Sequence, residues 1–181
     1  MSFVTGLTTA DVQALTTAQI VAMTTADMAA LSTTHLSAFT STQLQVFETR
    51  DIAALSAAQV SGGFSTAQIA WLLGTQIAAF TTSVVKSLTT SQLSAIETSD
   101  LQQMSTAQVA VLTTAQISAL TTEQVQSLGT SLVAAISTST IRAMTTDQVQ
   151  SIGTTNVQAL TSGQLAALTT SQVKALTTDQ V

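Results

Sequence analysis

The sequence restarts every eight residues. With position 1 set at Leu7, almost the whole chain divides into octads of the form LTTAQISA, and we count 22 of them, the last one incomplete. The register breaks once, at Gly63, which is one residue too many. Positions 1 and 6 are apolar in every octad, position 3 is nearly always Thr or Ser, and position 5 is mostly Gln. So short a repeat predicts a linear array of small, similar units.

The spacing of the two apolar positions limits the possible unit. Positions 1 and 6 differ by an odd number, so a strand would send them to opposite faces unless every octad contained a turn. Pro is absent and there are only seven Gly, so a β-solenoid is the less favoured alternative. In one continuous helix, eight residues at about 100° each would move the apolar stripe by about 80° per octad. A single helix therefore cannot keep these residues on one face.

A short helix in each octad accounts for the individual positions. Thr or Ser at position 2 or 3 can act as the N-cap, and Gln or Asp at position 5 completes a capping box if the cap is position 2. Positions 1 and 6 are then the two sites of a hydrophobic staple. The stronger Thr preference at position 3 leaves the later cap open as well. Both choices predict a helix over roughly positions 3 to 8.

The charged residues follow the same register. All nine acids lie at positions 2, 4 or 5, close to the expected helix start, and three of the four cations, Lys86, Arg142 and Lys174, lie at position 7. The helix macrodipole favours this arrangement of charge.

Helices of this length are not stable alone in water, so the octads must bury one another's apolar residues. We predict an all-α solenoid, with residues 1–6 as a lead-in and residues 7–181 as one array. The repeated phrases at Leu120 and Met144 lie 24 residues apart, which favours three octads per coil. The expected core anchors include Leu112, Ile117, Leu120, Val125, Leu128 and Val133.

Residues 61–76 depart from the pattern. This segment contains Gly62, the extra Gly63, the single tryptophan Trp71, and Gly74 in place of the position 3 Thr. A large aromatic side chain can anchor a partner. We favour local packing with a bend in the array, because glycines make room for a bulky neighbour.

The sequence offers little chemistry. His35 has no second His or Cys beside it for a metal cluster, and a polar surface role is favoured for it. The pairs Glu48 with Asp51 and Glu97 with Asp100 could bind calcium or act as acid and base, but their positions match helix starts, so capping explains them. We expect no enzyme activity, no cofactor and no metal site.

Several classes of partner are disfavoured by composition. Four Lys and Arg in 181 residues provide no basic surface for nucleic acid. No run of about 18 apolar residues suggests a membrane span, and the N-terminus does not read as a secretory signal. The absence of cysteine means that stability must come from packing alone.

The phrases LTTAQI, LTTSQV and LTTDQV resemble the Thr-, Ala- and Gln-rich tandem repeats of secreted or surface proteins of Gram-negative bacteria, of the adhesin and extracellular-fibre type. The resemblance covers the chain from Leu7 onwards. It implies an extracellular structural role in surfaces, aggregation or biofilm.

Both ends of the expected array carry apolar residues, with Phe3 and Val4 at one end and Leu176 and Val181 at the other. Solenoids without polar terminal caps tend to associate, and a head-to-tail contact that does not close produces a filament. We therefore expect the chain to bind itself as the subunit of an extracellular fibre. The alternatives are a repeat stalk or binding module of an adhesin and, more remotely, a Thr array that binds ice.

Overall fold

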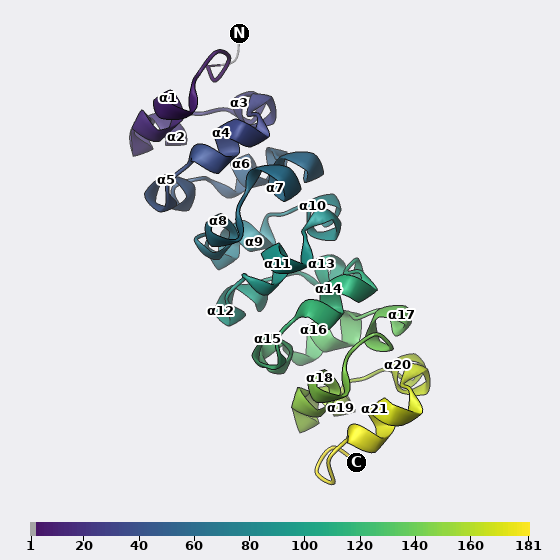
Figure 1. Cartoon of the computed structure of the whole chain (residues 1–181). Coiled ribbons are helices and arrows are strands. Elements are labelled where there is room, and N and C mark those ends of the chain that lie inside the picture. Colours follow the sequence, from purple (N-terminus) through teal and green to yellow (C-terminus); the bar gives the residue numbers. More distant parts are fainter. Residues whose placement is uncertain (1–2) are drawn as a thin grey trace.

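The computed structural model describes residues 3–181, and in these residues it contains helices and turns but no strand (Figure 1). The fold is the predicted all-α solenoid, and the β-solenoid alternative was wrong. The helices are α1 Thr9–Ala14, α2 Thr17–Val21, α3 Thr25–Ala30, α4 Thr33–Ala38, α5 Ser41–Gln45, α6 Thr49–Ala54, α7 Ala57–Gly63, α8 Thr66–Ala70, α9 Gly74–Ala78, α10 Thr82–Ser87, α11 Thr90–Ser94, α12 Thr98–Leu101, α13 Thr106–Ala110, α14 Thr114–Ala119, α15 Thr122–Ser127, α16 Thr130–Ala135, α17 Thr138–Ile141, α18 Thr146–Ser151, α19 Thr154–Gln158, α20 Ser162–Ala167 and α21 Thr170–Ala175.

The N-cap is position 2 of the octad. At α14, Thr113 has an extended backbone, and its hydroxyl accepts the Gln116 N–H at 3.2 Å. The Gln116 Oε1 in turn accepts the Thr113 N–H at 2.9 Å, which completes a capping box. The position 3 Thr is thus the first helical residue, and the structure decides between the two caps that the sequence left open.

Each helix ends without a left-handed residue. Leu120, at position 1 of the next octad, follows α14 in an extended conformation with φ −64° and ψ 143°, and its N–H donates to the Ile117 carbonyl. Among the described residues, only Gly6 has a positive φ. Because ordinary residues adopt these angles, the chain can turn after every helix without Pro and with few Gly.

Three helices make one coil. The helices inside the array pack against those three places before and after them, as α14 does against α11 and α17. The coils stack into an elongated array from the N-terminal α1 to the C-terminal α21 (Figure 1). This periodicity agrees with the 24-residue spacing in the sequence.

Positions 1 and 6 form the core inside the coils. In the middle of the array the position 6 residues Ile117, Val125 and Val133 are completely buried. The position 1 residues Leu112, Leu120 and Leu128 are at most 5% exposed. A single apolar core therefore runs along the array.

The four apolar residues expected at the ends differ in exposure. Phe3 is 49% exposed and Val181 94% exposed, and Leu176 is partly buried against the core. Val4 is completely buried, contrary to the expectation, because residues 3–6 form a turn that places it in the core. Residues 1–2 of the expected lead-in lie outside the described part of the chain.

The extra residue, Gly63, lengthens helix α7. α7 runs to Gly63 and still packs against both α4 and α10, so the array continues through the insertion. A Cβ on Gly63 would lie 3.0 Å from the Leu36 Cβ, whereas one on Gly62 would meet nothing closer than 3.5 Å. Gly63 is therefore needed for the close approach of α7 to α4.

Gly74, later in the irregular segment, also has a packing explanation, whereas no packing role is seen for Trp71. Gly74 begins α9, and a Cβ there would lie 2.7 Å from the Gln103 Cγ and 3.0 Å from Asp100 Oδ1. Trp71 follows α8 as its C-cap and is 39% exposed. Gly74 thus allows α12 to approach α9.

Candidate functional site: the joint between coils

The position 5 glutamine connects one coil to the coil before it. Gln116 Nε2 donates to the carbonyl oxygens of Val85 at 2.9 Å and Leu88 at 2.8 Å. These two carbonyls lie at the end of α10, four helices before α14. The same amide therefore caps the start of its own helix through Oε1 and the end of another helix through Nε2.

This arrangement recurs along the array. Gln148, for example, donates to Ile117 O at 2.8 Å and Leu120 O at 2.7 Å. We call these side chains and the carbonyls they bind the glutamine ladder. Other members are Gln43, Gln59, Gln68, Gln76, Gln92, Gln108, Gln124, Gln164 and Gln172.

The physical reason is the short length of the helices. The last carbonyls of a helix have no partner within it, and when they are buried each must find a donor elsewhere. In helices of four to seven residues this concerns a large share of the backbone. The glutamine ladder therefore supplies hydrogen bonds that longer helices would make internally.

His35 performs the role of glutamine in α4. Its Nδ1 accepts the Ser32 N–H at 3.3 Å, and its Nε2 lies 2.9 Å from the Leu7 carbonyl oxygen. Since Nδ1 is the acceptor, the hydrogen is assigned to Nε2, which donates to Leu7 O. His35 is half-buried, so its role is to join two coils, and the surface role that we favoured was wrong.

Shorter polar side chains keep part of the ladder. Asn156 Nδ2 donates to Leu128 O at 2.6 Å, and Thr140 Oγ1 donates to Leu112 O at 3.1 Å. Each reaches the nearer of the two carbonyls. An amide one methylene shorter than glutamine can thus still close the joint.

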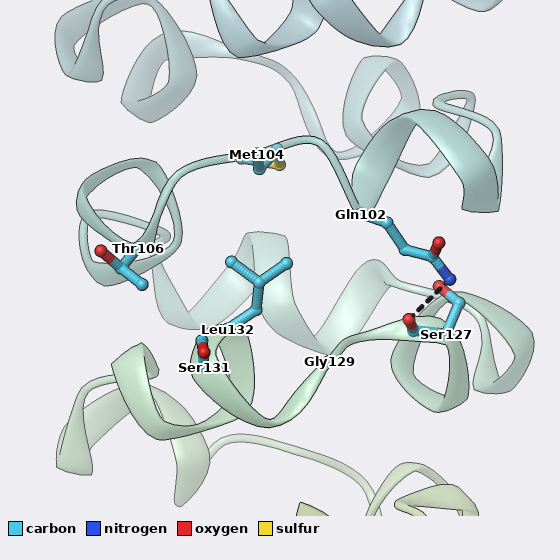
Figure 2. A pocket seen from close by; sticks show the side chains of 7 residues that line it. All are labelled: Gln102, Met104, Thr106, Ser127, Gly129, Ser131 and Leu132. Carbon is cyan, nitrogen blue, oxygen red and sulfur yellow. Dashed lines mark hydrogen bonds between the residues drawn. The ribbon is translucent and has the colours of Figure 1, made fainter.

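Val84 and Leu132 interrupt the ladder because their side chains cannot donate. Figure 2 shows Leu132 pointing toward the chain at Met104, at an open hollow of about 530 Å³ that Gly129 also lines. Gly129 is the N-cap of α16 and has no side chain to cap it. Across the hollow Gln102 Nε2 donates to Ser127 O at 2.9 Å. The coils stay joined here through apolar packing and this exposed bond.

Two acids at position 5 have carboxyl pKa values shifted in opposite directions. Asp11 is exposed, and hydrogen bonds from Thr8 lower its pKa. Asp100 has a raised pKa because it is partly buried and lies near Glu97, although a backbone hydrogen bond from Gly74 opposes the shift. Capping hydrogen bonds and burial therefore account for the two pKa shifts.

The candidate acids Glu48 and Asp51 make contacts at the start of α6. The Glu48 N–H donates to Asp51 Oδ2 at 3.0 Å, and Arg50 Nε lies 2.8 Å from Glu48 Oε2. In the described part of the chain no three His, Asp or Glu residues lie together as metal ligands. None of the described helices is long enough to cross a bilayer.

Sequence reasoning missed the glutamine ladder because it gave position 5 a capping role only. A capping box accepts Glu or Gln, yet no octad has Glu at position 5. Of these two side chains, only the Gln amide both accepts at Oε1 and donates at Nε2. The preference for the amide was therefore the available signal.

A family model described as the ALTTAQ repeat matches four stretches of the chain, residues 44–82, 93–130, 133–162 and 158–181. No curated protein matches the chain. The six letters cover position 8 and positions 1 to 5, as in Ala14–Gln19, and so end on position 5, the position of the ladder glutamines. Since the matches together cover more than half of the sequence, the chain belongs to the ALTTAQ repeat family.

Proposed function

We propose that the chain is a structural protein without enzymatic activity, and that copies of it stack head to tail into a fibre outside the cell. The observation that carries this proposal is the joint between coils, which is built from the same parts along most of the array. A contact between two copies can use the same apolar packing and the same amide-to-carbonyl hydrogen bonds as the contact between two coils.

The last described coil of this 181-residue chain presents surface suited to such a contact. The position 6 residues Leu165 and Val173 are 45% and 51% exposed, whereas the equivalent Ile117 is completely buried. A further coil would cover Leu165 and Val173 as the coil of α17 covers Ile117. Burying each of them would contribute about 1.5 to 3 kcal/mol when complete.

The first coil offers a partly matching surface. Gln19 Oε1 accepts the Thr16 N–H at 2.9 Å, while the Nε2 of this exposed side chain donates to no carbonyl of residues 3–181. Phe3, Met23 and Gln19 line a hollow of about 210 Å³ at this end. We place the apolar residues of one copy's last coil against this hollow of the next copy.

The extracellular location rests on the resemblance of the repeats to bacterial surface and fibre repeats, and the neutral Thr, Ser and Gln surface is compatible with it. The main competing function is a stalk or binding module that works as a single array. The two functions differ in whether the purified chain associates with itself.

Electron microscopy of the purified 181-residue chain over a range of concentrations tests the proposal. We expect long uniform fibres, and we expect the double variant Leu165→Asp with Val173→Asp to remain as separate particles. The matched control is Leu73→Asp, which places an acid at an exposed apolar residue on the side of the array, where Asp is a good N-cap.

The control should still form fibres. Separate particles of the unmodified chain at every concentration would exclude the fibre and favour the stalk. Fibres that persist in the double variant would exclude the proposed contact.

A further inference from the structure

Among the described residues, Asp51 is the one position 5 residue with a buried side-chain polar atom that has no hydrogen-bond partner. It is completely buried, and one carboxylate oxygen, Oδ2, accepts the Glu48 N–H as a glutamine Oε1 would. The other oxygen, Oδ1, is buried and has no hydrogen-bond partner. A buried oxygen without a partner is costly in free energy.

The register of the array identifies what Oδ1 faces. Glutamines in the adjacent octads donate to the carbonyls 31 and 28 residues before them, as Gln43 does to Val12 and Leu15. The same spacing relates Asp51 to the carbonyls of Ile20 and Met23, at the end of α2. An ionised carboxylate at this place would point an acceptor toward further acceptors.

Two other aspartates at position 5, the buried Asp27 and the partly buried Asp100, differ in this respect. Asp27 Oδ1 accepts the Phe3 N–H at 2.7 Å, and Asp100 accepts a backbone hydrogen bond from Gly74. Each of these two carboxyl groups therefore has a backbone N–H facing it. For Asp51, no described N–H takes the place of that donor.

We propose that Asp51 binds a proton in the folded array and, as a neutral carboxylic acid, donates a hydrogen bond to the Met23 carbonyl oxygen. The solvent supplies the proton, which forms an O–H bond at Oδ1 and removes the negative charge. The Asp51 side chain is long enough for this bond, because the equally short Asn156 donates to the carbonyl 28 residues before it. The joint between α2 and α6 would then tighten as the pH falls.

The charged groups around Asp51 have opposing effects. On its own helix, Glu48 disfavours the ionised form, and Arg50 Nε, 3.7 Å from Asp51 Oδ1, favours it. Arg50 is itself exposed and closer to Glu48 than to Asp51, so solvent screens its effect. Of the helices packed against α6, α3 contributes Asp27, whereas α9 has no titratable residue, and neither does α2 at the ladder contact.

Burial raises the pKa of the Asp51 carboxyl above its ordinary value of 3.8. A group whose pKa is higher in the folded state than in the unfolded chain binds more protons when folded. Its contribution to stability is therefore fully present below about pH 3.8 and is lost as the pH rises through the folded-state pKa.

Carbon-13 NMR titration of the Asp51 carboxyl in the full chain measures its protonation directly. We expect a midpoint above 3.8, while the exposed Asp11 carboxyl should titrate below its ordinary value. An Asp51 midpoint at or below 3.8 would overturn the proposal.

Thermal unfolding of Asp51→Asn provides the second test, since an amide supplies the donor at every pH. We expect its melting temperature to exceed that of the unmodified chain by about 2 to 4 °C at pH 7, and the gain to vanish near pH 3. The control Asp11→Asn should show no gain at pH 7, because that carboxylate is already capped by Thr8.

An equal melting temperature for Asp51→Asn and the unmodified chain at pH 7 would contradict the proposed protonation of Asp51. Millimolar calcium that stabilises the unmodified chain at pH 7, but not Asp51→Asn, would replace the proton with a bound cation. Because both measurements concern folding, they do not depend on whether the chain forms fibres.

Discussion

The regular octads of residues 112–128 and the irregular segment of residues 61–76 build the same coil in different ways. In the regular octads, Ile117 fills the core and Gln116 joins the coils. In the irregular segment, α7 carries an extra residue, and Gly63 allows it to lie close to α4. Because α7 still packs against α4 and α10, the stacking of every third helix depends on core and backbone contact more than on octad length.

The largest effect should come from breaking the core of the regular octads. Ile117→Asp places an unpaired charge at a completely buried position, and we expect a loss of more than about 3 kcal/mol in the free energy of unfolding. Urea denaturation followed by circular dichroism measures it. Ala115→Asp adds the same charge two residues away on the exposed start of α14 and should change stability by less than about 0.5 kcal/mol. Similar losses in both variants would contradict the assigned core.

A smaller loss should follow from breaking the glutamine ladder alone. Gln116→Glu keeps the capping oxygen but turns a second acceptor toward Val85 O and Leu88 O, which should cost about 1 to 3 kcal/mol at pH 7. The loss should shrink below the ordinary glutamate pKa of about 4.3, because the protonated acid can donate. Urea denaturation at pH 7 and pH 3.5 measures both, with Ala115→Glu as the control for added charge. A loss that does not depend on pH would argue against the donor role of Nε2.

The two neighbouring glycines of α7 test the packing of the irregular segment. Gly63→Ala should destabilise the chain by about 1 to 3 kcal/mol, because its Cβ would press on Leu36. Gly62→Ala has more space and should raise stability by about 0.5 to 1 kcal/mol, since Ala favours a helix. Thermal unfolding of the pair tests this difference, and equal effects would show that α7 and α4 do not approach as closely as described.

The sequence predicts most of the fold because each octad repeats the same local signals. The apolar residues at positions 1 and 6 specify the core. The similar phrases that begin at Leu120 and Met144, 24 residues apart, indicate three octads per coil. The position of the N-cap could not be decided, since Thr is common at both candidate positions. The burial of Val4 also depends on a turn that the octad pattern does not describe.

The candidate site was harder to predict than the fold. The partners of Gln116 lie in a helix four octads earlier, and no local rule relates residues so far apart. The same holds for His35, whose bond to Leu7 O depends on how the coils stack. The role of Asp51 emerges only when its position is compared with those of the glutamines in the adjacent octads.

The extended links between helices determine how such an array can change in length. Since no link needs a special residue, a block of three octads can be added or removed and every later helix keeps its row and its neighbours three places away. Adding one octad instead moves all later helices by a third of a turn, so a side chain that faced one direction then faces another. Length and facing direction are therefore separable properties of this chain, the first changed in steps of 24 residues and the second in steps of eight.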